Sequence, residues 1–412
     1  MMESIISVAY DRKRGFPMYQ ELEKNLRRAM NKAIDGHDVM GVNFLARKDG
    51  KEVLYCGEGF ADREAGRPIA RDTIFRLYSM TKPVTAAAVM LLLERGEIEL
   101  YQPVCDILPA FAGQKVYEDG ILKTPGRPVM IHDLLCMTSG LSYPDELTEA
   151  GRASGKVFDE AVARLGSENP MTTMELVNRL AEGPLAFAPG SLWQYGTSAD
   201  VLGAVIEAVS GKKFSEFLKE EIFLPLEMED TAFWVPKEKQ NRLAVTYETV
   251  TEDGDKKMIR YTGHNLAINN AMDKAPAYEA GGAGLVSTLD DYMKFAQMLL
   301  NGGSYGSAQI LQEKTVRYLT EGRLLPHQDA ELQHWIGLDG FTYSNLMRRC
   351  VEPERHKNLC AYGEYGWDGW LGMYFANFPK EKLTILIGTQ KKDAGTFSLT
   401  RKIRNIALGA LL

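Results

Sequence analysis

The most constraining feature of this sequence is a short β-like run that delivers a serine to the start of an apolar helix. Residues 73–77 have strand character, and Ser79 follows them directly. Residues 84–93 are almost entirely apolar, and Gly96 is placed to end their helix in the left-handed conformation. Pro83 falls in the first turn, where a missing N–H does least harm. We therefore expect a buried helix that begins beside the serine.

Lys82 lies three residues after Ser79, so the two side chains share one helical face and the amine can return to the hydroxyl. In a buried helix this lysine is poorly hydrated, and the positive end of the helix dipole lies at the serine. A serine beside a desolvated lysine is a nucleophile with its base. The same spacing recurs at Ser210 and Lys213, but there the serine ends an amphipathic helix with Gly211 as its C-cap. We interpret that second copy as structural.

Charge and hydropathy exclude two kinds of partner. The 412 residues carry a formal net charge of −7 and show no basic stripe, which argues against nucleic acid. No apolar stretch approaches the roughly 20 residues of a membrane span, and residues 1–20 lack the apolar run of a signal peptide. We expect a cytoplasmic protein of one large domain or two subdomains, with no nucleic-acid or membrane partner and an oligomeric state that the sequence does not give.

The cysteines and histidines give no sign of a metal site. The 5 cysteines are scattered, and no pair has zinc-ligand or redox spacing. The 6 histidines show no metal-binding spacing either. We expect buried free thiols, no metal ion and no cofactor.

Periodicity and turn residues predict the remaining elements. An amphipathic helix is expected over residues 18–34, and a hairpin over 42–56 that turns at Asp49-Gly50. The later chain is expected to form a helix over 289–300, strands over 370–377 and 383–390, and a closing helix over 396–411.

Strands at both ends of the chain imply an antiparallel sheet assembled from distant parts, with the terminal helices on one face. Between them, short helices are separated by Pro and Gly. We predict an α/β (α+β) fold in which residues 1–96 and 276–412 form the sheet domain. Residues 97–275 form an inserted, mainly helical domain.

Several short blocks, each weak alone, occur together along the chain. They are Ser79-Met80-Thr81-Lys82, residues 131–141, Pro189-Gly190, residues 193–203, residues 222–228, residues 281–288 and Trp367-Asp368-Gly369. In this combination and order, the chain resembles the serine β-lactamase-like family, in the branch of class C β-lactamases, D-peptidases, SxxK carboxylesterases and acyltransferases. The resemblance implies that family's fold, an antiparallel sheet flanked by helices with an inserted helical domain, and an active site at the domain junction.

The resemblance also implies roles for single residues. Ser79 matches the acylated nucleophile, Lys82 its lysine, and Tyr195 the tyrosine that exchanges protons with the serine and the leaving group. Trp367-Asp368-Gly369 takes the place of the family's Lys-Thr-Gly strand, after which the N–H of Trp370 joins that of Ser79 in an oxyanion hole. This chemistry needs a nucleophile, a base, an acid and two fixed donors.

The proton acceptor is left open by the sequence. Neutral Lys82 at pH 7 needs a pKa roughly 3 units below the free value, which apolar packing and a hydrogen bond to Tyr195 can supply. The two groups should titrate as a coupled pair, so either one can take the proton of Ser79.

Two other motifs compete with this site. Gly302 to Gly306 fits the Gly-x-Ser-x-Gly pattern of α/β-hydrolases, but a helix precedes Ser304 where that pattern requires a strand. Tyr343-Ser344-Asn345 fits the literal Tyr-x-Asn of lactamases better than the segment at Tyr195 does. It lacks the Pro-Gly before it and the helix after it, so we favour Tyr195.

Departures from the lactamase pattern bear on the substrate. Trp367 and Asp368 stand where lactamases have Lys and Thr, so an anionic substrate should meet repulsion there. Thr197 replaces an asparagine that would contact an acylamido group. Both changes resemble the esterase and transacylase branch.

The wall of the expected cleft is aromatic. It is assigned to Trp193, Trp367, Trp370, Tyr362 and Tyr365, with Trp193 and Tyr362 as core residues in the alternative interpretation. The glycine run 281–284 either lets the backbone approach the substrate or forms only a tight turn.

We therefore predict a serine hydrolase that cleaves small-to-medium neutral esters through an acyl-enzyme on Ser79, with weak or absent β-lactamase activity. The predicted substrate-binding residues are Trp367, Asp368, Gly369, Thr197 and Trp193. One alternative is an amide or D-peptide hydrolase, in which Asp368 favours an amine near the cleaved bond. The others are a transacylase, in which an alcohol replaces water, and a penicillin-binding sensor or scaffold without turnover. In the enzymatic cases the partner is a small-molecule ester or amide.

Overall fold

The computed structural model describes residues 17–118, 120–335, 337–395 and 397–412. The sequence analysis predicts no signal peptide in residues 1–20, and most of that segment, residues 1–16, lies outside the described residues. Thr396, the predicted start of the last helix, also lies outside them. In the described part of the chain, no helix is long and apolar enough to cross a membrane.

The fold is built on one antiparallel sheet of eight strands in the order β12-β13-β14-β15-β16-β1-β2-β3. The strands are β1 Gly41–Lys48, β2 Lys51–Asp62, β3 Arg67–Pro68, β12 Phe341–Ser344, β13 Met347–Cys350, β14 Tyr365–Asp368, β15 Tyr374–Phe378 and β16 Leu383–Thr389. At its centre the two ends of the chain meet, with Phe44 opposite Ile387. The β1–β2 hairpin turns at Asp49 and Gly50, whose φ values are 51° and 71°, as a type I′ turn requires. The predicted sheet of distant segments is confirmed.

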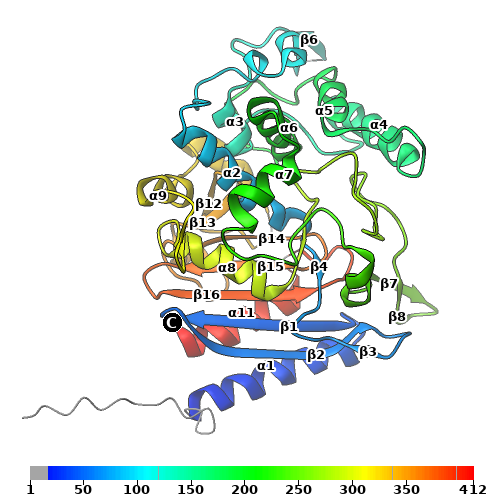
Figure 1. The fold of residues 1–412 in the computed structure, drawn as a ribbon, viewed down its shortest axis with the longest axis vertical. Helices are drawn as coiled ribbons and strands as arrows, with labels where there is room; N and C mark the ends of the chain where they lie inside the picture. The colour runs from blue at the N-terminus through cyan, green and yellow to red at the C-terminus, as the bar shows by residue number, and fades with distance from the viewer. Residues whose placement is uncertain (1–16, 119, 336, 396) are drawn as a thin grey trace, which may run out of the picture.

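The terminal helices cover one face of this sheet. Helices α1 Pro17–Asp35 and α11 Ser398–Leu411 pack against each other below β1 and β2 (Figure 1). Helix α1 buries an apolar stripe at Leu22, Leu26 and Met30, spaced four residues apart. Alternation along β1 sends Phe44 into this layer and Leu45 into the larger core on the opposite face.

The opposite face carries α8 Leu289–Leu300, which packs on β15 and β16, and α2 Lys82–Glu94, which is buried from Lys82 to Leu92. Further helices lie beyond α2 (Figure 1). They are α3 Ile131–Cys136, α4 Glu149–Arg164, α5 Thr173–Ala181, α6 Ser198–Ser210 and α7 Phe214–Leu218, with α9 Glu313–Glu321 and α10 Pro326–Leu332 beside the sheet edge. Helices α2 and α8 match their predicted extents.

Short hairpins complete the fold. They are β5 Val116–Glu118 with β6 Ile121–Lys123, β7 Tyr247–Glu252 with β8 Asp255–Arg260, β10 Ser304–Tyr305 with β11 Ala308–Gln309, and the pair β4 Phe75–Arg76 with β9 Val286–Ser287. The first two lie within residues 97–275 and were not predicted. The domain boundaries at 96 and 276 stay a prediction.

One predicted strand is placed differently by the structure. Strand β15 begins at Tyr374 and not at Trp370, because the chain first turns at Gly369 to Gly372. The N–H of Gly372 donates to the carbonyl of Gly369 at 2.8 Å, and the φ of Gly372 is +92°. This turn places Trp370 beyond the end of β14 and leaves its backbone outside the sheet.

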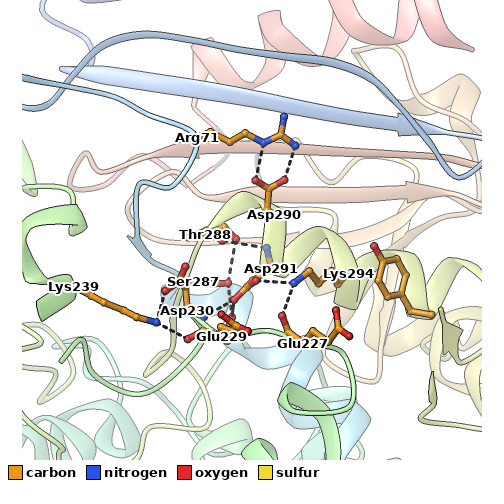
Figure 2. Close-up of polar contacts among 12 residues, drawn as sticks. Arg71, Glu227, Glu229, Asp230, Lys239, Ser287, Thr288, Asp290, Asp291 and Lys294 are labelled. Carbon is orange, nitrogen blue, oxygen red and sulfur yellow. Dashed lines mark hydrogen bonds and ion pairs between the residues drawn. The ribbon is translucent and has the colours of Figure 1, made fainter. Parts of the chain in front are cut away.

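A polar network fastens the start of α8 to its surroundings (Figure 2). Asp291 accepts from the N–H of Asp230 at 2.7 Å, and Arg71 donates to Asp290 at 2.7 Å. The side chain of Thr288 caps the helix by accepting from the N–H of Asp291. Because α8 follows β9 directly, this network also fixes the strand that pairs with β4 in front of the serine.

All five cysteines are free thiols, as predicted. Cys105 and Cys360 are half-buried and not fully buried. Although no redox spacing exists in the sequence, the Sγ atoms of Cys350 and Cys360 lie 3.8 Å apart.

Candidate active site

The serine loop is held tightly on its N-terminal side. Strand β4 pairs with β9, and the N–H of Leu77 donates to the carbonyl of Leu285 at 2.8 Å. Tyr78 then has a φ of +45°, an uncommon conformation for a bulky residue that is often found at functional sites. It turns the chain into a 3₁₀ turn, Tyr78–Thr81, that leads into α2. Ser79 is half-buried in this turn, while the residues around it are buried.

Lys82 has no exposed surface, and its amine has three partners. The Nζ atom lies 3.1 Å from the Oγ of Ser79, 3.0 Å from the hydroxyl of Tyr143 and 2.7 Å from the carbonyl oxygen of Gly282. A carbonyl can only accept, so one N–H is committed to Gly282. Either hydroxyl can donate to the lone pair of a neutral amine, so this geometry suits both protonation states.

The surroundings of Lys82 favour the neutral form. Burial lowers the pKa of Lys82 to about 7, against the opposing charges of Asp200 and Asp368. Asp368 forms an ion pair with Arg348 at 3.2 Å. A buried amine with a pKa near neutrality can both take and return a proton at physiological pH.

Tyr195 lies over the same amine, with its ring centroid 4.6 Å from the Nζ of Lys82. Its hydroxyl accepts from the Nε1 of Trp367 at 3.0 Å and is hydrogen-bonded to Ser79. Burial raises the pKa of Tyr195 well above its ordinary value, so the phenol keeps its proton at neutral pH. The structure therefore brings Ser79, Lys82 and Tyr195 together.

Tyr143 is a member of this cluster that the sequence analysis missed. It follows the 131–141 block by two residues, which was the available signal. Its ring lies 5.6 Å from that of Tyr195, and the ring centroid is 5.3 Å from the Nζ of Lys82. Burial and the charge of Asp200 raise the pKa of Tyr143 well above its ordinary value, so it contacts Lys82 as a neutral phenol.

The turn after β14 reaches the serine loop. The ring of Trp370 packs against that of Tyr78 at 4.9 Å. A Cβ at Gly369 would lie 2.2 Å from the carbonyl oxygen of Leu77, so only glycine allows this approach. Among the described residues, the backbone N–H groups of Ser79 and Trp370 have no acceptor. The oxyanion hole at these two donors stays a prediction.

The glycine run 281–284 forms a tight turn, as one of the two predicted alternatives stated. The turn faces α2, since the carbonyl of Gly281 accepts from Thr85 and that of Gly282 from Lys82, and it faces α6 through the N–H of Gly282, which donates to Asp200. A Cβ at Gly281 would lie 2.2 Å from the carbonyl oxygen of Ala199. The glycines therefore serve close packing around the lysine.

Comparison with protein families decides the relationship. A family model described as Beta-lactamase matches residues 24–409. The chain belongs to the beta-lactamase family. Within it, Esterase EstB of Burkholderia gladioli is 35% identical over 291 residues, which cover 66% of this chain and 69% of EstB. Protein Rv1367c of Mycobacterium tuberculosis is 30% identical over 80% of both chains.

Solved structures agree on the fold. The structure described as EstCE1, a hydrolase with promiscuous acyltransferase activity, has a TM-score of 0.78 at 24% identity and covers 95% of this chain and 99% of its own. A structure of Simvastatin Synthase (LovD) from Aspergillus terreus has a TM-score of 0.75 at 22% identity, with 93% and 97% covered. This member of the beta-lactamase family is a serine hydrolase.

In this site of a beta-lactamase-family protein, Asp368 and Thr197, two predicted substrate-binding residues, have contacts or burial that the prediction did not include. Asp368 was expected to repel anions, but its ion pair with the buried Arg348 balances its charge. Thr197 has no exposed surface and precedes the first turn of α6, so it does not present its hydroxyl to a cleft.

The aromatic wall is made by a partly different set of residues. Trp193 is buried, and its ring packs against Tyr195, Tyr343 and Trp335 at 6.4, 5.5 and 5.4 Å. Trp335, which was not predicted, is 41% exposed and lies 5.1 Å from the ring of Tyr195. It therefore forms an accessible side of the wall.

Two predicted wall residues lie elsewhere. Tyr365 is buried and its hydroxyl contacts Asn377 at 3.0 Å. Tyr362 is 58% exposed and packs on Arg349, so neither the wall nor the core prediction holds for it.

The competing motifs have structural places in this fold. Tyr343 lies within β12, 5.1 Å from the ring of Trp367, and its buried hydroxyl has no hydrogen-bond partner in the described part of the chain. Ser304 starts the short strand β10 after α8, without the strand-to-helix turn that an α/β-hydrolase needs. Ser210 ends α6, with Gly211 as a left-handed cap, as predicted.

Proposed function

We propose that this serine hydrolase cleaves small-to-medium neutral esters through an acyl-enzyme on Ser79. The observation that carries the proposal is the buried amine of Lys82, 3.1 Å from the Oγ of Ser79, with a pKa lowered to about 7. A base poised near the working pH is the one that general-base catalysis favours. The 35% identity to Esterase EstB supports an ester as the substrate.

Each step has a residue in place. Neutral Lys82 takes the proton of Ser79 as the Oγ atom bonds to the ester carbonyl carbon. The N–H groups of Ser79 and Trp370 hold the resulting oxyanion. When the tetrahedral intermediate collapses, the C–O bond breaks and Tyr195 protonates the departing alcohol. Tyr195 then regains a proton from Lys82, directly or across the hydroxyl of Ser79.

Water completes the cycle by the same route in reverse. It attacks the acyl carbon while Lys82 accepts its proton, and Ser79 leaves as the alcohol after regaining that proton. The raised pKa of Tyr195 supports its assignment as the acid, and the lowered pKa of Lys82 supports its assignment as the base.

The polarity of the site supports a neutral substrate. Asp368 and Arg348 balance one another, which removes a net charge that could select an ionic substrate. The accessible surfaces near Ser79 include Tyr195, Trp335 and Trp370, and aromatic faces suit apolar acyl or alcohol groups.

Intact-protein mass spectrometry after reaction with a fluorophosphonate tests the proposal. We expect one adduct, located on Ser79 and missing in S79A, together with turnover of p-nitrophenyl butyrate that exceeds turnover of a cephalosporin. A labelled Ser79 with faster cephalosporin hydrolysis would contradict the ester preference. A wild-type protein without any adduct would favour the sensor or scaffold.

A transacylase is the second candidate, because relatives with this activity resemble the chain. Acyltransferase calJ of Penicillium decumbens is 25% identical over 64% of this chain. The two candidates differ in whether water or an alcohol attacks the acyl-enzyme. Adding increasing amounts of a primary alcohol to the ester assay separates them, since only a transacylase converts most of the acyl group into a new ester.

A further inference from the structure

Asp200 is a buried acid that the proposed reaction steps do not use. It lies in the first turn of α6, with 2% of its surface exposed. Its Oδ1 atom accepts from the hydroxyl of Tyr278 at 2.7 Å and from the N–H of Gly282 at 3.0 Å. Its Oδ2 atom is buried and has no hydrogen-bond partner among the residues that the structure describes. A carboxylate in this situation is costly unless an opposite charge lies nearby.

The nearby opposite charge is Lys82, and Gly282 connects the two. The amine donates to the carbonyl of Gly282 at 2.7 Å, and the N–H of the same glycine donates to Asp200. A Cβ at this glycine would lie 2.9 Å from the Oδ2 of Asp200 and 2.7 Å from the hydroxyl of Tyr143. The carboxylate and the hydroxyl partner of Lys82 therefore meet at one Cα atom, which must be a glycine.

The other groups around Lys82 do not supply the same charge. Those that face it are Ser79, Tyr143 and Tyr195, with the carboxylates Asp200 and Asp368. The hydroxyls are neutral, and Asp368 is already paired with Arg348. Within the described part of the chain, the hydrogen bonds of Asp200 come from neutral donors alone. Burial raises the pKa of Asp200, and the charge of Lys82 opposes this rise and favours the ionised carboxylate.

We propose that Asp200 is a positioning residue, the buried counter-charge that holds the Gly282 turn against Lys82 and keeps the amine able to carry a proton. This inference rests on the proposed function, in which that proton passes between Ser79, Lys82 and Tyr195. Burial favours the neutral amine, and the carboxylate favours the ammonium ion. Their balance lets the amine accept a proton in one step and release it in the next.

The substitution D200N tests this role, because an amide keeps an acceptor oxygen for Tyr278 and Gly282 while it removes the charge. Without the carboxylate the neutral amine persists to lower pH. We expect the acidic limb of kcat/KM for p-nitrophenyl acetate to move down by about one pH unit. The rate of labelling of Ser79 by a fluorophosphonate should show the same shift.

The matched control is E279Q. Glu279 is a buried carboxylate in the neighbouring segment, and its side chain accepts from the N–H and the hydroxyl of Ser215 on α7, both at 2.6 Å. We expect the acidic limb of kcat/KM for the E279Q enzyme to coincide with that of the wild type.

A folded D200N enzyme whose limb stays in place, or moves to higher pH, overturns the proposal and leaves Asp200 as a helix-turn residue only. If D200N does not fold, D200S replaces it, since the serine hydroxyl can also accept from Gly282 without a charge. The same downward shift is expected, and the same results overturn the proposal. A wild-type enzyme that is never acylated contradicts the proposed function itself, whereas an unmoved limb in an acylating enzyme contradicts the role of Asp200 alone.

Discussion

Two buried cations in this molecule, Arg404 and Lys82, have opposite environments. Arg404 on α11 forms a buried ion pair with Glu364 and a hydrogen bond with the hydroxyl of Tyr374. Burial lowers its pKa, but the carboxylate of Glu364 outweighs burial and raises the pKa above the ordinary value. The amine of Lys82 is hydrogen-bonded to three neutral oxygens of the described residues, and its pKa is lowered to about 7.

The difference shows how the fold separates stability from reactivity. The guanidinium of Arg404 is charged in any case, and the bonded carboxylate of Glu364 compensates that buried charge and ties α11 to the loop before β14. Beside Ser79, the amine of Lys82 is hydrogen-bonded to neutral oxygens instead of a carboxylate, and it becomes a group that titrates at neutral pH. A buried basic residue therefore serves as a structural tie at Arg404 and as a proton carrier at Lys82.

The largest expected effect is that of K82R. An arginine cannot become neutral in a protein, so it cannot accept the proton of Ser79. We expect kcat/KM to fall by about 10⁴-fold, as for K82A, which corresponds to about 5 kcal/mol. Ester hydrolysis and thermal melting are the measurements, and a folded K82R enzyme that keeps a tenth of the activity would refute Lys82 as the base.

The second effect appears in stability. E364Q removes the charge partner of Arg404 and leaves a buried unpaired cation, which we expect to cost about 3–5 kcal/mol of unfolding free energy in urea titrations. E321Q is the control, because Glu321 pairs with Arg317 on the surface and should cost less than about 1 kcal/mol. The pH profile of the remaining folded E364Q enzyme should match the wild type; a displaced acidic limb would show that the two regions are not separate.

A smaller effect is expected for G369A. The new methyl group would lie 2.2 Å from the carbonyl oxygen of Leu77, so the turn that carries Trp370 must move away from the serine loop. Because the N–H of Trp370 would then be displaced from the proposed oxyanion hole, we expect kcat to fall by roughly 30-fold, with KM changed less. G166A is the control, since a Cβ there meets nothing within 4 Å. Equal activity of both variants would show that Gly369 is not needed to position the N–H of Trp370.

The smallest effect needs no substitution. Because protonated Lys82 cannot act as a base, kcat/KM should rise with pH through about 7, by about tenfold between pH 6 and pH 8. The raised pKa of Tyr195 keeps its proton in place, so no loss of activity is expected between pH 8 and pH 9. An activity that is flat between pH 6 and pH 8 would mean that Lys82 does not titrate as the buried amine should.

Local signals were sufficient for much of the fold. The apolar spacing in α1 and α8, and the Asp49-Gly50 turn, depend on residues a few positions apart, which is why these elements are where the sequence predicts them. The spacing of Ser79 and Lys82 is of the same kind, because one helical turn brings them together whatever the rest of the chain does.

Long-range contacts were beyond such reasoning. Lys82 contacts Tyr143, 61 positions away in the sequence, and Gly282, 200 positions away. No local pattern encodes either contact. The same holds for Arg348, whose pairing with Asp368 depends on the register of neighbouring strands. The sequence identified the charge at position 368 but could not show that another strand balances it.

The pairing of β1 with β16 sets an order of events during biosynthesis. Residues 41–48 emerge from the ribosome long before residues 383–389, which form the strand that completes their hydrogen bonding, are translated. Until then β1 has an unpaired edge, which favours chaperone contact and association with other chains. The turn that brings Trp370 to the nucleophile lies just ahead of that last strand. Residues 370–389 must therefore be translated before a polypeptide of this design can acquire any catalytic power.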